Sequence, residues 1–453
     1  MRHQLLVVCL TVISAGCMVG PNYKRPSVPA IPQYRAGESQ PTQASLGDTK
    51  WFDLFQDDTL RALITEAQSA NYDVLIAAQR VLAAEGQLAA TRSGLFPQLG
   101  GHGEAARTGV NSPIQSWGGA WGVASWEIDL FGKLRRASEA ARADMLALQE
   151  NFKGVMQTLV AQVAMAYFDL REYDAEIEYV RQSIQAREES VKLVAARVQG
   201  GVAGALELDQ AKSLVASAQA NLALLEKAQE QTENLINNLL GKQPGPVARG
   251  RSLVDQPQPP QVPAGLPSSL LERRPDLREA EQQLIAANAR VGVAKAAFYP
   301  SINLTASGGY QTTDLLGVVS RSGFSYSTGA FVDLPIFDAG RRRGNYKTAQ
   351  AQHQELLFNY ERAINGAFRD VSDALVGYRQ SKEYSGRQQI LADTLRDQSR
   401  LASARYTGGV SSYLEVLDTE RQRLTAEQEL AQSQRDVLTS LVGLYKALGG
   451  GWQ

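Results

Sequence analysis

Residues 196–207 read Ala-Arg-Val-Gln-Gly-Gly-Val-Ala-Gly-Ala-Leu-Glu, and residues 404–415 read Ala-Arg-Tyr-Thr-Gly-Gly-Val-Ser-Ser-Tyr-Leu-Glu. The second stretch repeats the first in one register, about 200 residues later. Two further pairs match in the same order: Leu95-Phe96-Pro97 with Phe298-Tyr299-Pro300, and Leu240-Gly241 with Leu448-Gly449. A single duplication of this size predicts two structurally equivalent halves, because the repeats of a solenoid are far shorter.

Each half contains a long stretch without proline that is rich in Ala, Gln, Glu, Arg and Leu, which is typical of long helices. The first, residues 133–199, predicts a helix of about 67 residues and roughly 100 Å. The return helix, 205–240, spans only roughly 54 Å. The difference in length between these two helices is about the length of the helix before the first strand, which could therefore stack end to end on the return helix. The second half repeats this with residues 341–406, 412–446 and 276–298. We therefore expect two long helices and two stacked pairs of shorter ones per chain.

Residues 98–131 and 301–337 lose the helical period and become rich in Gly, Ser, Thr and aromatic residues. Alternation is clearest from Ile302 to Tyr310, and each region predicts one β-hairpin. These strands alone would favour a small soluble sheet. Few Leu or Val within them, and aromatic residues at their ends, favour a barrel in contact with lipid.

Four strands cannot close a membrane barrel, for which about eight is the lower limit. Open sheet edges are not tolerated in lipid. The chain is therefore expected to assemble, and three copies would supply twelve strands and twelve helical columns.

The N-terminus has the pattern of a secretory signal: basic residues, an apolar core too short to span a membrane, and small residues before Cys17. Ser14-Ala15-Gly16 before Cys17 resembles the lipobox of bacterial lipoproteins, although that motif prefers Leu where Ser14 stands. Cys17 would then carry the lipid, palmitate included. Ordinary signal cleavage beside an incidental cysteine is the alternative.

Proline-rich stretches follow Cys17 and separate the two halves, which predicts an extended arm and a linker. The expected organisation is as follows: signal peptide 1–16, lipid-anchored extended arm 17–56, first repeat 57–242 with β-hairpin 98–131, linker 243–269, second repeat 270–449 with β-hairpin 301–337, and tail 450–453.

Composition argues against several classes of function. The formal net charge of −1 gives no reason to expect nucleic acid. The three histidines, His3, His102 and His353, are scattered, and no metal-binding spacing, phosphate loop or nucleophile motif accompanies them. We therefore expect neither catalytic residues nor a metal or other cofactor.

Three sets of residues give the chain a wider resemblance: residues 20–26 (Gly-Pro-Asn-Tyr-Lys-Arg-Pro), residues 271–277 (Leu-Glu-Arg-Arg-Pro-Asp-Leu), and the twin Gly-Gly turns. With these motifs in this order, the mature chain resembles the TolC-like outer-membrane efflux proteins, in the lipoprotein branch typified by OprM and NodT-type channels. The resemblance implies a mainly α-helical chain with a membrane β-barrel. A homotrimer would form a 12-stranded barrel continued by a periplasmic α-helical barrel.

The resemblance also implies a function. The trimer would be the exit duct of a tripartite efflux pump in the outer membrane, in contact with its lipid. It would pass small molecules such as drugs from a periplasmic adaptor (membrane fusion) protein and an inner-membrane pump of the RND type to the exterior. A duct for type I protein secretion shares this fold and stays open as the alternative. A structural coiled-coil protein of the envelope is a third class, against which the two β regions stand.

The twin turns and the helix after the second turn supply the expected site residues. Gly residues can adopt the positive φ that ends a helix, and by resemblance these turns meet the adaptor. The adaptor-contacting turn residues are Gly200, Gly201, Val202, Gly408, Gly409 and Val410. By the same resemblance the periplasmic gate consists of Leu414, Asp418, Arg421 and Arg405. The alternatives are a coiled-coil core position for Leu414 and a surface ion pair for Asp418 and Arg421.

Overall fold

The computed structural model describes residues 18–27, 45–108, 115–256, 269–312 and 324–451. The expected signal peptide and Cys17 lie outside the described residues, as do Trp452 and Gln453 of the expected tail.

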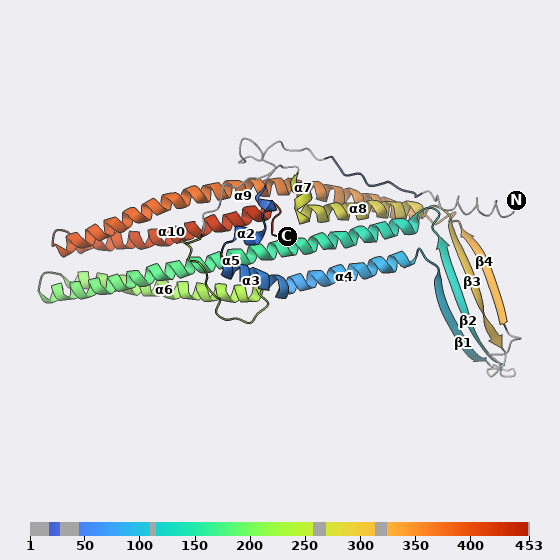
Figure 1. Cartoon of the computed structure of the whole chain (residues 1–453), viewed down its shortest axis with the longest axis horizontal. Helices are drawn as coiled ribbons and strands as arrows, with labels where there is room; N and C mark the ends of the chain where they lie inside the picture. Colours follow the sequence, from blue (N-terminus) through green and yellow to red (C-terminus); the bar gives the residue numbers. More distant parts are fainter. Residues whose placement is uncertain (1–17, 28–44, 109–114, 257–268, 313–323, 452–453) are drawn as a thin grey trace. The chain divides into compact units, whose positions relative to one another are not determined.

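Long helices dominate the chain and repeat in matched lengths (Figure 1). Helices α5 (Lys133–Gln199) and α9 (Arg341–Thr407) each have 67 residues. Their return helices, α6 (Ala205–Leu239) and α10 (Tyr413–Ala447), each have 35. The predicted pattern of a long helix and a shorter return in each half is confirmed.

Shorter helices precede each hairpin of strands. They are α3 (Asp58–Ala70), α4 (Tyr72–Ser93), α7 (Leu270–Arg273) and α8 (Pro275–Ala296). Pro275 begins α8, as expected of a proline at the first helical position. The single helix expected before the first strand is divided into α3 and α4 at Asn71. The Oδ1 of Asn71 accepts hydrogen bonds from the N–H groups of Asp73 and Val74 and so caps α4.

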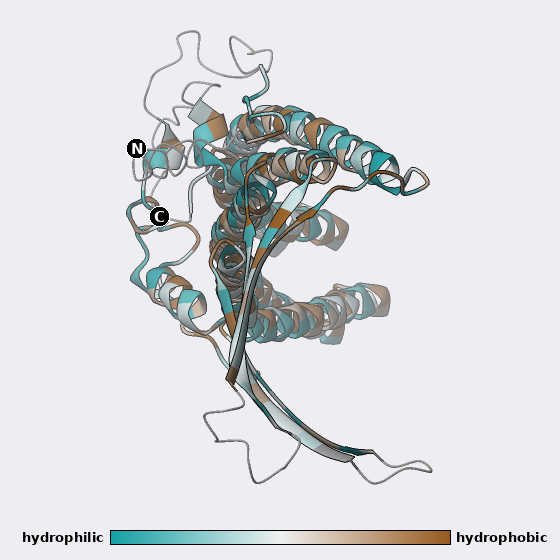
Figure 2. Cartoon of the chain, turned by 90° about the vertical axis from the view of Figure 1, so that its right-hand side faces the viewer, coloured by the Kyte–Doolittle hydropathy of each residue, from teal (hydrophilic) through white to brown (hydrophobic). Residues whose placement is uncertain are grey.

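The four strands are β1 (Gln98–Thr108), β2 (Gln115–Ile128), β3 (Ser301–Thr312) and β4 (Phe324–Asp333). They form one antiparallel sheet in the order β1-β2-β3-β4, curved in Figure 2. The two predicted hairpins are confirmed, and β2 joins them by pairing with β3, with Ala124 opposite Ala306. Strands β1 and β4 are left at the two edges of the sheet.

The chain divides into two compact units, and each unit takes parts of both repeats. One contains the sheet, with Gln79–Asn151 and Asp276–Ala363; the other contains Phe152–Pro275 and Ile364–Gln453. The sequence repeats are thus not separately packed bodies, because the long helices of both repeats continue from one unit into the other.

The described part of the N-terminal arm, residues 18–27, is extended and lies against the unit that contains the sheet. The N–H of Val19 donates to the Phe131 carbonyl at 3.1 Å. Arg136, 1% exposed, donates to Asn22 at 2.7 Å, and Tyr23 donates to Glu281 at 3.1 Å. The extended form expected for the whole of 17–56 is wrong at its end, where η1 (Leu46–Asp48) and α2 (Trp51–Leu54) form. A capping box between Ser45 and Asp48 satisfies the backbone there and favours the first helical turn.

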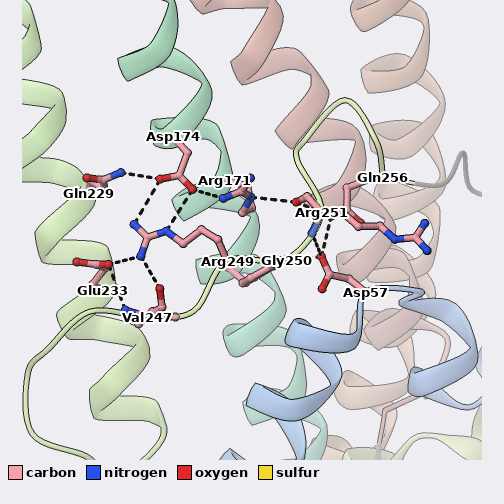
Figure 3. Close-up of polar contacts among 11 residues, drawn as sticks. Asp57, Arg171, Asp174, Gln229, Glu233, Val247, Arg249, Gly250, Arg251 and Gln256 are labelled. Atoms are coloured by element: carbon pink, nitrogen blue, oxygen red, sulfur yellow. Dashed lines mark hydrogen bonds and ion pairs between the residues drawn. The ribbon is translucent and has the colours of Figure 1, made fainter. Parts of the chain in front are cut away.

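Charged residues fasten the described part of the linker to the second unit (Figure 3). Arg249 contacts Asp174 on α5 and Glu233 on α6. A few residues on, the N–H of Arg251 donates to Asp57 at 2.9 Å. Its prolines predict only a linker between the two halves. In the structure, hydrogen bonds and ion pairs fix residues 247–256 of this linker to α5, α6 and Asp57.

Asp57 is the deepest of these anchor points, at 1% exposure. Its carboxylate accepts hydrogen bonds from the Tyr167 hydroxyl at 2.8 Å, from Gln256 at 3.1 Å, and from the N–H groups of Leu60 and Arg251. Burial raises the pKa of Asp57, but these hydrogen bonds outweigh burial and bring the pKa below its ordinary value. The ionised carboxylate is therefore the form that holds α3, α5 and the linker together.

Candidate tip and gate of the helical hairpins

The two Gly-Gly turns close the helical hairpins α5–α6 and α9–α10 with the same backbone geometry. In the first turn, Gly201 has φ +72° and its N–H donates to the Val198 carbonyl, while the N–H of Val202 donates to the Arg197 carbonyl at 2.9 Å. This pair of bonds is a Schellman motif, which satisfies carbonyls left free at a helix end. Residues 405–410 repeat it, with φ +74° at Gly409.

Apolar side chains project from both tips at equivalent places. Val202 and Leu206 are 77% and 71% exposed, and their counterparts Val410 and Leu414 are 68% and 66% exposed. Side chains with this exposure do not pack into the interior of the single chain. The core interpretation of Leu414 is therefore wrong for a single chain.

Aromatic residues and one arginine tie the two hairpins to each other near their tips. Tyr406 and Tyr413 are buried with ring centroids 5.1 Å apart, in a cluster with Val194 of α5. The Tyr413 hydroxyl is 3.0 Å from Ser190 Oγ. Arg197 lies 4.3 Å over the ring of Tyr406 and donates to its carbonyl at 3.0 Å. The arginine thus caps α9 from the other hairpin, combining a cation–π contact with a charge-assisted hydrogen bond.

The four expected gate residues lie on one hairpin, but the three charged ones belong to two separate ion pairs. Arg421 donates to Asp418 at 3.2 Å across one turn of α10, and Gln422 donates to the other oxygen of Asp418 at 2.6 Å. Arg405 lies 3.5 Å from Glu415, so within the chain it is a partner of Glu415 and not of Asp418. Both pairs are exposed to solvent. Pairs of this kind contribute little in water, so any larger role for Asp418 depends on what surrounds it in an assembly.

Comparison with known proteins identifies the chain. The model of the family described as "Outer membrane efflux protein" matches residues 63–242 and 266–450. The solvent efflux pump outer membrane protein SrpC of Pseudomonas putida is 35% identical, with 100% of this chain and 99% of the relative aligned. The cation efflux system protein CusC of Escherichia coli is 33% identical, with 99% of each aligned.

The chain belongs to the outer membrane efflux protein family.

Solved structures of the family agree with the fold. A crystal structure of CusC has a TM-score of 0.88 at 32% identity and covers 96% of this chain and 100% of its own. The open state of the Neisseria gonorrhoeae channel MtrE has a TM-score of 0.89 at 31% identity, covering 96% and 99%. The predicted fold class and the TolC-like resemblance are confirmed: the chain is an outer-membrane efflux channel whose trimer combines a strand barrel with a helical tunnel. Within the described ranges, no helix combines the length with the apolarity that a membrane crossing requires.

A cluster of buried acids lies between α5 and α10 of this efflux channel. Arg435 on α10 contacts Asp169 at 2.9 Å, Glu172 at 3.2 Å and its neighbour Asp436 at 2.9 Å. Glu172 and Glu176 are both buried, and Gln432 donates to Glu176 at 2.9 Å. Burial raises the pKa of Glu172 to about 7 against the opposing attraction of Arg435, and burial also raises the pKa of Glu176. One guanidinium thus faces more carboxylates than it can neutralise.

A second ionic cluster joins α9 to α10 nearer the tip. The buried Glu427 accepts from Arg396 at 2.7 Å and contacts Arg423 at 3.3 Å, and Arg423 also contacts Glu420 at 2.9 Å. The buried Glu427 thus contacts two arginines, whereas the buried Glu172 contacts one, Arg435. Among the described residues, no group of three or more His, Cys, Asp or Glu side chains is arranged to hold a metal ion.

Sequence reasoning located both turns but missed three features of the site. Leu206 was not singled out although it is the counterpart of Leu414, and the repeat itself carried that signal. The position of Arg197 over Tyr406 was not expected. Neither was the burial of Glu172, because the pattern of charges along a helix does not reveal which other helix covers it.

Proposed function

We propose that this channel is the exit duct of a tripartite pump and that its two helical tips are docking sites for the periplasmic adaptor. The observation that carries the proposal is the matched exposure of Val202, Leu206, Val410 and Leu414 around two rigid turns. Equivalent surfaces on both hairpins fit a partner that meets each of them in the same way. The channel moves solute passively, and the inner-membrane pump supplies the energy and most of the selectivity.

The substrates that we propose are small toxic molecules. The relatives are named for solvent, toluene and cation efflux, and they align with this chain over nearly its whole length. These names cover different chemistries, which agrees with a duct that does not itself select.

Changing the tips tests the docking proposal. We expect Val202→Glu together with Val410→Glu to abolish in vivo cross-linking to the adaptor and to restore susceptibility to exported compounds, because a buried unpaired carboxylate disfavours an apolar interface. Leu224→Glu is the matched control, since Leu224 is 66% exposed on α6 but away from the turn. Normal adaptor cross-linking in the double variant, at normal amounts of channel in the outer membrane, would refute the docking role.

The gate that we propose combines Leu414 and Asp418, with Arg421 and Arg405 holding their helix in place. Three copies around an axis would bring three Asp418 carboxylates together, and such a ring attracts cations. The local pairs of Asp418 with Arg421 and Gln422 support this gate, since they orient the carboxylate before assembly.

The lipid anchor that we propose is Cys17, on the strength of the small residues before it. Replacing Cys17 by Ser should remove the labelling of the protein by radioactive palmitate, because no acceptor thiol would follow the signal. The barrel should still insert, since its strands hold it in the membrane independently. Palmitate labelling that persisted in Cys17→Ser would rule out this anchor.

A further inference from the structure

The helices attached to the two edges of the sheet are α4 and α9. Helix α4 leads into edge strand β1, and edge strand β4 leads into α9. In a trimer that closes its barrel, β4 of one protomer pairs with β1 of the next. Closure therefore brings α9 of one protomer beside α4 of its neighbour.

The duplication supplies a template for that contact inside a single chain. Helices α4 and α8 each have 22 residues, and α5 and α9 each have 67, so the helices of the two repeats correspond residue for residue. Helix α8 packs on α5 within the chain. The equivalent contact, between α4 and α9, is the one that closure of the barrel between protomers would create.

Burial shows that α4 lacks a neighbour that α8 has. Ala286 and Ala289 of α8 are fully buried, whereas the corresponding residues of α4, Ala83 and Gly86, are exposed. The equivalent faces of the two helices therefore differ: that of α4 is exposed, and that of α8 is buried.

Within the chain, the α5–α8 contact includes two ion pairs. Arg278 on α8 contacts Glu150 on α5 at 3.0 Å, and Arg290 contacts Asp144 nearer the sheet. At the end of the contact, the rings of Phe131 and Tyr299 stack with centroids 4.7 Å apart.

At the corresponding positions of the second contact, neither of these two ion pairs is present. Leu75 stands on α4 where α8 has Arg278, and Phe358 stands on α9 where α5 has Glu150; they are 44% and 60% exposed. Gln87 and Gln352 replace the Arg290–Asp144 pair. The aromatic stack keeps its character, because the exposed Phe96 and Phe337 correspond to Tyr299 and Phe131.

We propose that α4 of each protomer packs on α9 of a second copy in the register of α8 on α5, with Leu75 against Phe358 and Phe96 against Phe337. This inference rests on the proposed channel and adds the residues that join its subunits. The contact between chains would be apolar and the contact within the chain contains ion pairs, so each helix favours its correct neighbour. A wrong match would bury Arg278 against Phe358 or Glu150 against Leu75, leaving one charge without its partner.

Cross-linking tests the register directly. Leu75→Cys with Phe358→Cys, treated in membranes with a short bismaleimide, should give a covalent trimer on a denaturing gel, while each single variant should stay monomeric. The matched control is Arg278→Cys with Glu150→Cys, which should link within the chain, adding the mass of one linker without changing the oligomer. If the protein is trimeric by light scattering and only the control pair reacts, the proposed register is refuted while the channel stands. A monomeric protein would refute both.

Exchanging the chemistry of the two contacts gives a second test. Leu75→Arg and Phe358→Glu should each lower the temperature at which the trimer dissociates in detergent, because each buries an unpaired charge. Together they reproduce the Arg278–Glu150 pair, and at least half of the lost thermal resistance should return. A double variant no more resistant than the weaker single variant would show that the two residues do not face each other.

Discussion

At the scale of single residues, Gly201 and Gly409 determine the backbone geometry of the two turns. A β-carbon at Gly201 or Gly409 would meet nothing within 4 Å, so space is not the constraint. The constraint is the positive φ, at +72° and +74°, which L-residues adopt at a cost. Within the Gly200-Gly201 pair, therefore, only the second glycine needs to be glycine.

Gly201→Ala should lower the free energy of unfolding of the hairpin by about 1 kcal/mol through backbone strain. Gly200→Ala is the matched control and should be neutral or slightly stabilising, because Gly200 has no positive φ and its added β-carbon would make only ordinary contacts. Thermal denaturation followed by helical circular dichroism measures both. Equal effects of the two substitutions would mean that φ is not what selects glycine at the turn.

At the scale of elements, charge is distributed unevenly between the helices. Between α5 and α10, one arginine, Arg435, contacts three carboxylates, including the buried Glu172. Between α9 and α10, the buried Glu427 contacts two arginines, Arg396 and Arg423. A carboxylate whose pKa burial raises takes up a proton more readily in the folded state than in the unfolded chain. Its ionised form therefore lowers the free energy of unfolding at pH values above the pKa of the folded state. This destabilisation disappears as the pH falls toward the pKa of the unfolded chain.

Glu172→Gln should accordingly stabilise the protein at pH 8, by on the order of 1–3 kcal/mol, and should make no difference near pH 4.5. The window follows from the rise of the Glu172 pKa from 4.5 to about 7. Arg435 keeps Asp169 and Asp436 as partners in the variant. Glu178→Gln, on the exposed side of α5, is the control and should show no such pH dependence. A variant less stable than the wild type at pH 8 would mean that the attraction of Arg435 exceeds the cost of burial.

At the scale of the whole molecule, function depends on groups that come together only in the trimer. The four-stranded sheet has open edges at β1 and β4, the tips expose apolar residues, and Asp418 is paired only on its own helix. Each feature is incomplete in one chain and becomes meaningful when copies or partners are added.

Asp418→Ala, and more strongly its combination with Arg421→Ala, should loosen the proposed gate, because the local pair that orients the Asp418 carboxylate is lost. Single-channel conductance in planar bilayers should rise on the order of twofold or more, and cation selectivity should weaken. Asp209→Ala is the control on α6, where the register differs from that of Asp418 by one residue. Unchanged conductance and selectivity in the double variant would assign Asp418 and Arg421 to a solvated helix face.

The sequence alone determined the long helices and the strands of this protein, but not the short helices η1 and α2. Proline-free stretches and Gly-Gly pairs set where α5, α6, α9 and α10 begin and end, because the signals that start and stop a helix are local. Loss of the helical period indicated both strand regions, and alternation was clearest in the second of them. The duplication indicated that both halves share one plan, and four strands were too few to close a barrel without copies of the chain.

Only the tertiary structure decided which elements meet. The pairing of β2 with β3, the burial of Glu172 beside Arg435, the position of Arg197 over Tyr406 and the anchoring of the linker on Asp57 all join residues far apart in the chain. The physical reason is that burial and charge pairing depend on what covers a residue. The repeat shows this most clearly: Arg278 and Leu75 occupy the same place in two equivalent helices, but one contacts Glu150 in its own chain and the other is left exposed.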